Sequence, residues 1–301
     1  MRVFVAGATG VLGTAAVRRL VAGGHAVTGI ARTPVRRQRL VAAGVAPVDV
    51  DLFDPDAVRR ALEAHDVVCN LATRIPVGTA ALRTSSWREN DRVRTEGSAV
   101  LAKAAADCGV LRLIQEAVAF AYADAGDEWV TEQSPIASSP LLRSSLEATE
   151  NAMGFADQYR FAVVLRFGLF YGDDANTQWQ LERVRRGKPV LLGEPSGYIS
   201  PIAIDDAAAA VVASLAAPSG IYNVAGTPVQ RTEWARALGT AAGVDGSAKF
   251  VPALTRRVLG GKTTDPLARS LRISSDAFHT ATGWRARTPL AEGFASAVKA
   301  R

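Results

Sequence analysis

The first half of the chain alternates short runs of apolar, often β-branched residues with longer stretches whose apolar positions recur at helical spacing. The short runs are apolar at almost every position, which is typical of strands covered by helices on both faces. The alternation therefore predicts a parallel sheet between two layers of helices. We expect strands at Val3–Ala6, Ala26–Ala31, Val45–Asp49, Val67–Leu71, Leu111–Glu116 and Phe161–Arg166. We expect helices at Val11–Ala22, Val35–Ala43, Pro55–Ala64, Arg92–Cys108 and Leu142–Tyr159.

The regular alternation stops after Gly172. Helical patterns then recur at Gln178–Arg186, Asp205–Ala216, Thr232–Ala242 and Pro252–Gly260, with extended pieces at Gly197–Ile204 and Gly220–Val224. We therefore expect an α/β fold in two parts. Residues 1–172 would form a Rossmann-type, doubly wound, dinucleotide-binding domain. Residues 173–301 would form a smaller substrate-binding lobe that is partly interleaved with the sheet.

A glycine-rich turn joins the first expected strand to the first expected helix, and it reads Gly7-Ala8-Thr9-Gly10-Val11-Leu12-Gly13. Gly7 allows the tight turn, Gly10 lets the backbone approach a pyrophosphate, and Gly13 lets the helix pack closely on the strand. The helix N-terminus adds free N–H groups that favour phosphates. We expect a dinucleotide here; the alternative is a turn whose glycines serve packing alone. The expected contacts are Gly7, Thr9, Gly10, Val11, Leu12 and Gly13.

The end of the second expected strand bears on the choice of cofactor. Sheets that prefer NAD carry an acidic residue there for the ribose hydroxyls, whereas this chain has Arg32. A guanidinium at this place suits a 2′-phosphate, so we expect NADP(H) to be preferred over NAD(H). The alternative is that Arg32 belongs to the solvated basic start of a helix.

Charge and cysteine content narrow the range of partners. The chain has 35 basic and 29 acidic residues, a net charge of +6, and its basic residues are scattered, which disfavours a nucleic-acid or membrane surface. Two cysteines outside any Cys-x-x-Cys or Cys/His cluster predict neither a metal site nor disulfides. Met1 leads directly into a strand and the glycine turn, and no stretch of 18 apolar residues occurs, so we expect a cytoplasmic protein. We expect its partner to be a small-molecule substrate. The oligomeric state stays open, with a homodimer as one arrangement.

Several of these segments resemble the NAD(P)-dependent epimerase/dehydratase family, a branch of the short-chain dehydrogenase/reductase superfamily. Beyond the glycine turn, Asp51-Leu52 resembles the family's acidic-apolar pair near the adenine, and Asn70-Leu71-Ala72 resembles the element that lines the nicotinamide side. Val164–Gly172 and Ile202–Asp206 resemble later landmarks, with Ala203 where histidine is usual. The resemblance spans nearly the whole chain. It implies cofactor contacts from Asp51, Leu52, Leu71, Ala72 and Thr73.

The chain departs from this family at the catalytic residues. The family uses Tyr-x-x-x-Lys and an upstream Ser or Thr, and the tyrosine passes the proton that accompanies hydride transfer. Here the tyrosine position falls on Leu141 or Leu142, the lysine position on Ser145 or Leu146, and the Ser/Thr position near Glu116 or Ala117. All three standard groups are therefore missing.

Nearby acid/base groups are the candidates to replace them. Glu116 ends the fifth expected strand, where open α/β sheets bind ligands, and Tyr122 follows six residues later. An apolar setting would raise the pKa of Glu116 enough for proton exchange near neutrality. The alternatives are that Glu116 pairs with an arginine and that Tyr122 packs in the core.

Three functions remain open from the sequence. The first is an NADP(H)-dependent oxidoreductase or epimerase that acts on a small carbonyl or hydroxyl compound with non-standard acid/base residues. The second is a non-redox isomerase, dehydratase or cyclase on the same scaffold, and the third is a protein that senses NADP(H) without turnover. The expected substrate contacts are Trp87, Arg166, Tyr198 and Ser200.

Overall fold

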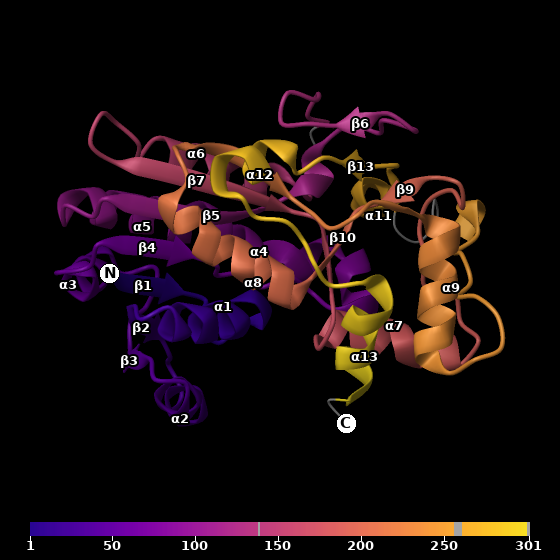
Figure 1. The fold of residues 1–301 in the computed structure, drawn as a ribbon, viewed down its shortest axis with the longest axis horizontal. Helices are drawn as coiled ribbons and strands as arrows, with labels where there is room; N and C mark the ends of the chain where they lie inside the picture. The colour runs from indigo at the N-terminus through magenta and orange to yellow at the C-terminus, as the bar shows by residue number, and fades with distance from the viewer. Residues whose placement is uncertain (138, 256–260, 300–301) are drawn as a thin grey trace.

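A seven-stranded sheet forms the centre of the fold (Figure 1). The computed structural model describes residues 1–137, 139–255 and 261–299. The strand order is β11-β7-β5-β4-β1-β2-β3, and every neighbouring pair is parallel. The expected doubly wound Rossmann-type fold is therefore confirmed. The strands are β1 (Arg2–Ala6), β2 (Ala26–Ile30), β3 (Ala46–Val48), β4 (Val67–Asn70), β5 (Arg112–Val118), β7 (Phe161–Phe167) and β11 (Gly220–Val224).

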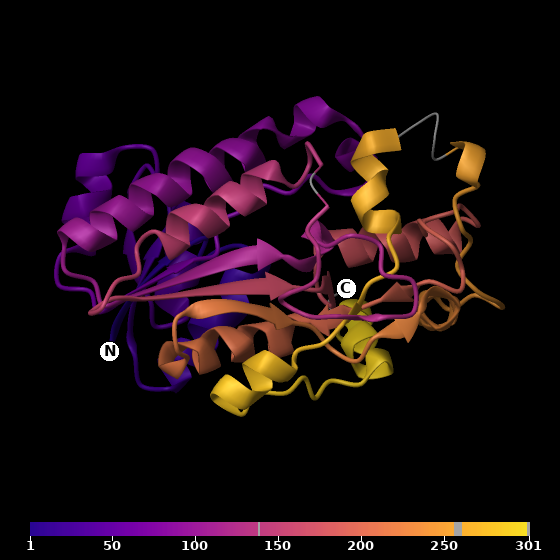
Figure 2. The same ribbon diagram turned by 90° about the horizontal axis from the view of Figure 1, so that it is seen from above.

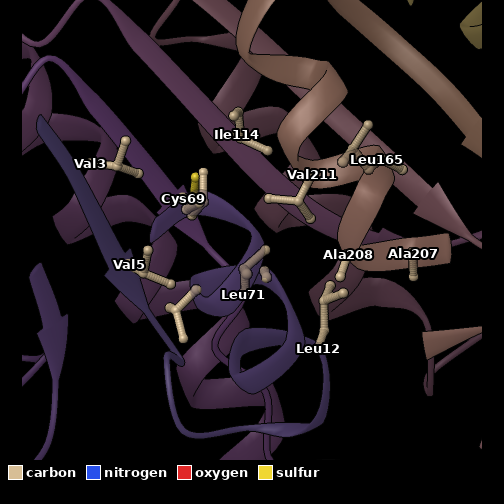
Figure 3. Close-up of a cluster of buried hydrophobic side chains, with 14 of the residues drawn as sticks. Val3, Val5, Leu12, Cys69, Leu71, Ile114, Leu165, Ala207, Ala208 and Val211 are labelled. Carbon is tan, nitrogen blue, oxygen red and sulfur yellow. The ribbon is translucent and has the colours of Figure 1, made fainter. Parts of the chain in front are cut away.

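The continuous apolar runs arise because both faces of the sheet are covered. Along β1, Val3 and Val5 belong to one buried cluster, while Phe4 and Ala6 belong to the other. Figure 3 shows the first cluster, in which strand side chains such as Cys69 lie against two helices. These helices are α1 (Val11–Ala22) and α8 (Ile204–Ala213). Helices α3 (Pro55–Leu62), α5 (Ser98–Asp107) and α6 (Arg143–Met153) cover the opposite face.

The sheet also takes elements from the part of the chain beyond Gly172. Strand β11 pairs with β7 along its whole length, from Gly220 opposite Val163 to Val224 opposite Phe167. Helix α8 packs on α1, and Figure 2 shows α8 in orange on the face opposite the magenta helices α5 and α6. Residues beyond Gly172 therefore supply both an edge strand of the sheet and a helix that covers one of its faces.

A second, smaller core lies beyond the carboxyl ends of the strands. Tyr171 meets Trp234 of α9 with ring centroids 5.5 Å apart and Phe294 of α13 with centroids 5.2 Å apart. The helices of this core are α7 (Ala175–Arg185), α9 (Arg231–Ala242) and α13 (Leu290–Lys299). Helix α12 (Asp276–Thr282) packs instead against β11, and α11 (Gly261–Ala268) contacts the turns at Gly78–Leu82 and Ala119–Ala121. Short strand pairs tie this region together: β6 (Trp129–Val130) with β13 (Arg272–Ile273), β8 (Leu169–Tyr171) with β10 (Pro201–Ala203), and β9 (Tyr198–Ile199) with β12 (Val229–Gln230).

Some expected boundaries were wrong. The helix expected at Arg92–Cys108 begins earlier, as α4 (Arg88–Arg92), and passes through a π-helical turn at Val93–Gly97 before α5. The helix expected at Leu142–Tyr159 ends at Met153, because Gly154 and a turn closed by the Asp157 carboxylate follow it. The last five residues of the helix expected at Pro252–Gly260 lie outside the described residues.

Helix α2 (Pro34–Ala42) and the 3-10 turns η1 (Gly78–Leu82), η2 (Thr84–Trp87) and η4 (Ala119–Ala121) complete the elements near the sheet. Across the described ranges, no helix is both long and apolar enough to cross a membrane. The same ranges contain no group of three His, Cys, Asp or Glu side chains able to hold a metal ion.

Candidate active site

The glycine turn lies at the point where the strand order reverses, between β1 and β4. Gly7 has a φ of +82°, and a Cβ there would lie 2.5 Å from the Leu71 carbonyl oxygen. A Cβ at Gly13 would overlap the Gly7 carbonyl group. Protein packing alone therefore requires these two glycines, as the sequence predicted from the turn and the helix packing.

Gly10 is different because a Cβ there would make one tight contact with the protein and would not overlap it. Its backbone is extended, with φ −78° and ψ 179°, which any residue adopts. A Cβ would meet only the Gly7 carbonyl oxygen, at 3.2 Å. Gly10 lines a cavity and caps α1 without any side-chain hydrogen bond, so the first N–H groups of the helix face an open cradle. A pyrophosphate fits this cradle in shape and in charge.

The cavity has a volume of about 830 Å³ and runs from the glycine turn past the carboxyl ends of β4 and β5. This size lies toward the upper end of the range for small-molecule and cofactor sites. Most of the expected cofactor contacts line it, together with one residue expected to meet substrate and one expected to act as an acid or base. These residues are Gly7, Thr9, Gly10, Val11, Leu12, Arg32, Leu52, Leu71, Ala72, Thr73, Trp87 and Glu116.

One end of the cavity is basic. Arg32 lies 3.9 Å from the Asp51 carboxylate, and both side chains are about half exposed, at 46% and 57%. Such a loose, exposed pair holds its partners weakly, so the Arg32 guanidinium is available to a ligand. Arg36, in the first turn of α2, also lines the cavity. Asp51 itself does not line it, and its carboxylate accepts a hydrogen bond from the Phe53 backbone N–H at 3.2 Å.

The other end contains a buried polar cluster. The Arg94 guanidinium donates through Nη2 to both Glu116 carboxylate oxygens, at 2.9 and 2.7 Å, and through Nη1 to the Ser145 hydroxyl oxygen at 3.0 Å. The Arg94 and Glu116 side chains are only 3% and 4% exposed, yet all three residues line the cavity. Leu141 and Leu142 line it beside them.

This cluster includes residues that the sequence pattern placed at or near the family's catalytic positions. The family pattern allowed Glu116 or Ala117 for the Ser/Thr position and Ser145 or Leu146 for the lysine position, and of these Glu116 and Ser145 line the cavity. Both Glu116 oxygens accept hydrogen bonds from Arg94, so the carboxylate is committed to a buried ion pair. Within the described part of the chain, no Tyr, Lys, His or Cys lines the cavity.

Tyr122 lies apart from the cavity. It follows the 3-10 turn after β5 and does not line the cavity. Its hydroxyl donates to Asn223 Oδ1 and accepts from Arg166 Nη1, both at 2.8 Å. Burial raises the pKa of the Tyr122 phenol. The structure therefore does not bring Tyr122 and Glu116 together, and it fixes both Tyr122 and Arg166 in a buried hydrogen-bonded cluster.

Two further residues expected near substrate also serve the protein's own framework. The Ser200 hydroxyl donates to the Leu271 carbonyl oxygen at 2.8 Å and accepts from the Ile273 N–H at 2.9 Å. The Tyr198 ring lies beside the Arg272 guanidinium, 5.2 Å from it. Neither residue lines the cavity. Trp87 does line it, and its ring N–H donates to the Ala81 carbonyl oxygen at 3.0 Å.

Arg94 is the functional candidate that the sequence did not single out. It lies in the π-helical turn, and its partners Glu116 and Ser145 are 22 and 51 residues away in sequence. The available signal was an arginine in the first turn of the helix expected at Arg92–Cys108. π-helical turns inside α-helices occur frequently at functional sites.

Comparisons with known proteins show which family the chain resembles in sequence. A model of the NAD dependent epimerase/dehydratase family matches residues 3–225. The 3-diazoavenalumate denitrifying reductase of a Streptomyces species is 31% identical over 303 residues, which cover 96% of this chain and 97% of that protein. The 2-alkyl-3-oxoalkanoate reductase of Shewanella oneidensis is 31% identical over 227 residues, which cover 69% of this chain and 55% of that protein.

Solved structures share the fold over almost the entire chain. The UDP-glucose 4-epimerase of Thermus thermophilus, in complex with NAD, superposes with a TM-score of 0.79 at 24% identity and covers 99% of this chain and 98% of its own. MoeE5, in complex with UDP-glucose and NAD, superposes with a TM-score of 0.80 at 21% identity, with the same coverage. Both of these neighbours hold NAD.

Proposed function

The chain belongs to the NAD-dependent epimerase/dehydratase family, and on that premise we propose that it is an NADP(H)-dependent reductase of a small, electron-poor acceptor. Family and relatives support a nucleotide-binding oxidoreductase or epimerase. The choice of reductase rests on one observation: the dinucleotide cradle is complete, while the cavity end that should carry the family's tyrosine and lysine is lined by Leu141, Leu142 and Ser145.

The residues that would hold the dinucleotide follow from the cavity. The cradle at Gly10 and the N-terminus of α1 would bind the pyrophosphate. Arg32, with Arg36 beside it, would bind the 2′-phosphate, which favours NADP(H). Leu71 and Ala72, at the end of β4, would line the nicotinamide side. When bound, the nicotinamide supplies a hydride.

The missing base favours reduction over epimerisation. To epimerise a carbinol carbon by oxidation and re-reduction, an enzyme must first take a proton from the hydroxyl group, which needs a base near the reacting atoms. Glu116 has both oxygens bound to Arg94, and the Asp174 carboxylate accepts three hydrogen bonds at the start of α7. Glu89, the other carboxylate that lines the cavity, is exposed to solvent, and no Tyr, Lys or His of the described chain lines it. Hydride addition to an electron-poor acceptor has no such requirement, because a proton from water completes the reaction afterwards.

Two classes of acceptor fit this proposal, and each is the substrate class in the name of a relative. One relative is named as a denitrifying reductase of 3-diazoavenalumate, a diazo compound, and the other as a reductase of 2-alkyl-3-oxoalkanoates. The match to the first covers nearly the full length of both chains, which favours the diazo class here. The second relative supports a small carbonyl compound as the alternative substrate.

The test follows nicotinamide absorbance after the protein is mixed with NADPH and either an aromatic diazo compound that carries a neighbouring oxygen or a 3-oxo acid. We expect NADPH to be consumed with at least one class, faster than NADH, and the variant Gly10→Ala to show little consumption. NADPH that binds but stays unconsumed with both classes would instead support a dinucleotide-sensing protein. A protein that binds neither nicotinamide cofactor would refute the proposal.

A further inference from the structure

The buried ion pair at the end of the cavity is a costly way to stabilise a fold. Taking Arg94 and Glu116 out of water costs several kcal/mol per charge, and well-packed apolar residues in their place are often as stable or more so. Both side chains are nonetheless almost fully buried, and both line the cavity. A buried charge pair that faces a ligand cavity is a candidate for a functional role.

We propose that Arg94 and Ser145, held in place by Glu116, form a binding site for a negatively charged oxygen of the substrate, in place of the family's tyrosine and lysine. This inference rests on the proposed reductase function and names the part of the acceptor that the site holds. The oxygen is a carbonyl oxygen, either on the atom that receives the hydride or conjugated with it, and it becomes negative when the hydride adds. Glu116 is a positioning residue, because it acts through Arg94.

The hydrogen-bond inventory leaves donors for such an oxygen. A guanidinium has five N–H donors, and the hydrogen bonds of the cluster commit three of them, two to Glu116 and one to Ser145. The Ser145 hydroxyl oxygen accepts from Arg94, and no described residue accepts from the hydroxyl proton. That proton and the remaining N–H groups are therefore free for a ligand in the cavity.

The ion pair also has a direction. Glu116 takes the Nη2 side of the guanidinium, while Nη1 lies at Ser145. The pair is thus a fixed dipole whose positive end is next to the free hydroxyl proton. Fixed donors aimed at a developing negative charge in a water-poor site are among the most effective catalytic devices known in enzymes.

The chemistry balances without a protein acid. When hydride adds to the acceptor atom, its electron pair forms the new bond to hydrogen, and the π electrons of the conjugated system move to the oxygen. The oxygen becomes negative and is stabilised by the Ser145 hydroxyl and the Arg94 guanidinium. A proton from water neutralises it after the hydride has arrived, so no side chain needs to be consumed or regenerated.

A phenol probe tests the site without any cofactor or turnover. We would titrate 4-nitrophenol, whose absorbance differs between its neutral and ionised forms, with the protein free of dinucleotide. The unmodified protein should bind the ionised form more tightly than the neutral form. In Ser145→Ala, this preference should fall about tenfold or more, the usual effect of losing a hydrogen bond to a charged group.

Three variants separate a binding role from a structural one. Arg94→Met combined with Glu116→Leu removes both charges at similar volume and should abolish the preference. Ser144→Ala is the matched control, since Ser144 is the adjacent serine, donates to Asp91 at 2.7 Å and does not line the cavity; it should bind the probe like the unmodified protein. If the double variant fails to fold, the Ser145→Ala titration alone still tests the binding role.

An unmodified protein that shows no preference for the ionised probe, including no binding at all, would overturn the inference. A Ser145→Ala variant that keeps the full preference would overturn it as well. Because the titration uses no NADPH, failure here would leave the reductase proposal standing, and failure of NADPH binding would leave the probe titration interpretable.

Discussion

Gly10→Ala isolates the dinucleotide cradle from the packing of the fold. The extended backbone at Gly10 accepts alanine, and the added Cβ would meet only the Gly7 carbonyl oxygen, at 3.2 Å. Replacing glycine at a compatible conformation changes stability by about 1 kcal/mol or less. Because Gly10 lines the cavity, we expect the same Cβ to crowd a pyrophosphate that approaches the backbone there. We therefore expect NADPH affinity to fall at least about tenfold, or about 1.4 kcal/mol, with the free energy of unfolding nearly unchanged.

Gly13→Ala is the matched control because its Cβ would overlap the Gly7 carbonyl group instead of facing the cavity. Overpacking of this kind costs about 1–3 kcal/mol of stability. Calorimetric titration with NADPH gives the affinities, and urea unfolding gives the stabilities. A Gly10→Ala variant that is stably folded and binds NADPH as tightly as the unmodified protein would show that the pyrophosphate does not lie over Gly10.

The remaining predictions concern three other side chains. Arg32→Glu should weaken NADPH at least about tenfold, since a charge-assisted hydrogen bond is lost, and leave NADH within a few-fold; equal effects on both cofactors would remove Arg32 from the 2′-phosphate site. Tyr122→Phe should lower the free energy of unfolding by about 1–3 kcal/mol, because buried Asn223 and Arg166 lose a partner, while calorimetry shows unchanged NADPH affinity; a large loss of affinity would return Tyr122 to the site. Burial raises the pKa of the Asp174 carboxyl, so the folded state binds its proton more tightly than the unfolded state does. The free energy of unfolding of the unmodified protein, compared with that of Asp174→Asn, should therefore fall as the pH rises through the folded-state pKa of Asp174. Urea unfolding of both proteins between about pH 4 and about pH 7 measures this difference, and a difference independent of pH would contradict it.

The sequence predicted the parts of the fold that local chemistry determines. The strand expected at Gly220–Val224 has those bounds in the structure, and the family resemblance is confirmed by a model match over residues 3–225. The three glycines of the turn share one spacing, but only the structure separates Gly7 and Gly13, which packing requires, from Gly10, which it does not.

The chemistry at the far end of the cavity depends on contacts that periodicity does not reveal. Six residues separate Glu116 from Tyr122, and a single 3-10 turn between them sends the two side chains to different clusters. Arg94 reaches the cavity through a π-helical turn, which changes the face that a helix presents, and its partners come from a strand and a helix far along the chain. Only the assembled sheet and its helices bring these groups together.

A structure of the protein crystallised with NADP⁺ tests the central claim most directly, because it locates every part of the dinucleotide in one experiment. We predict the pyrophosphate over Gly10 at the N-terminus of α1, the 2′-phosphate beside Arg32, and the nicotinamide at the cavity end lined by Glu116 and Ser145. Density for the dinucleotide outside this cavity, or an empty cavity at saturating NADP⁺, would contradict the account.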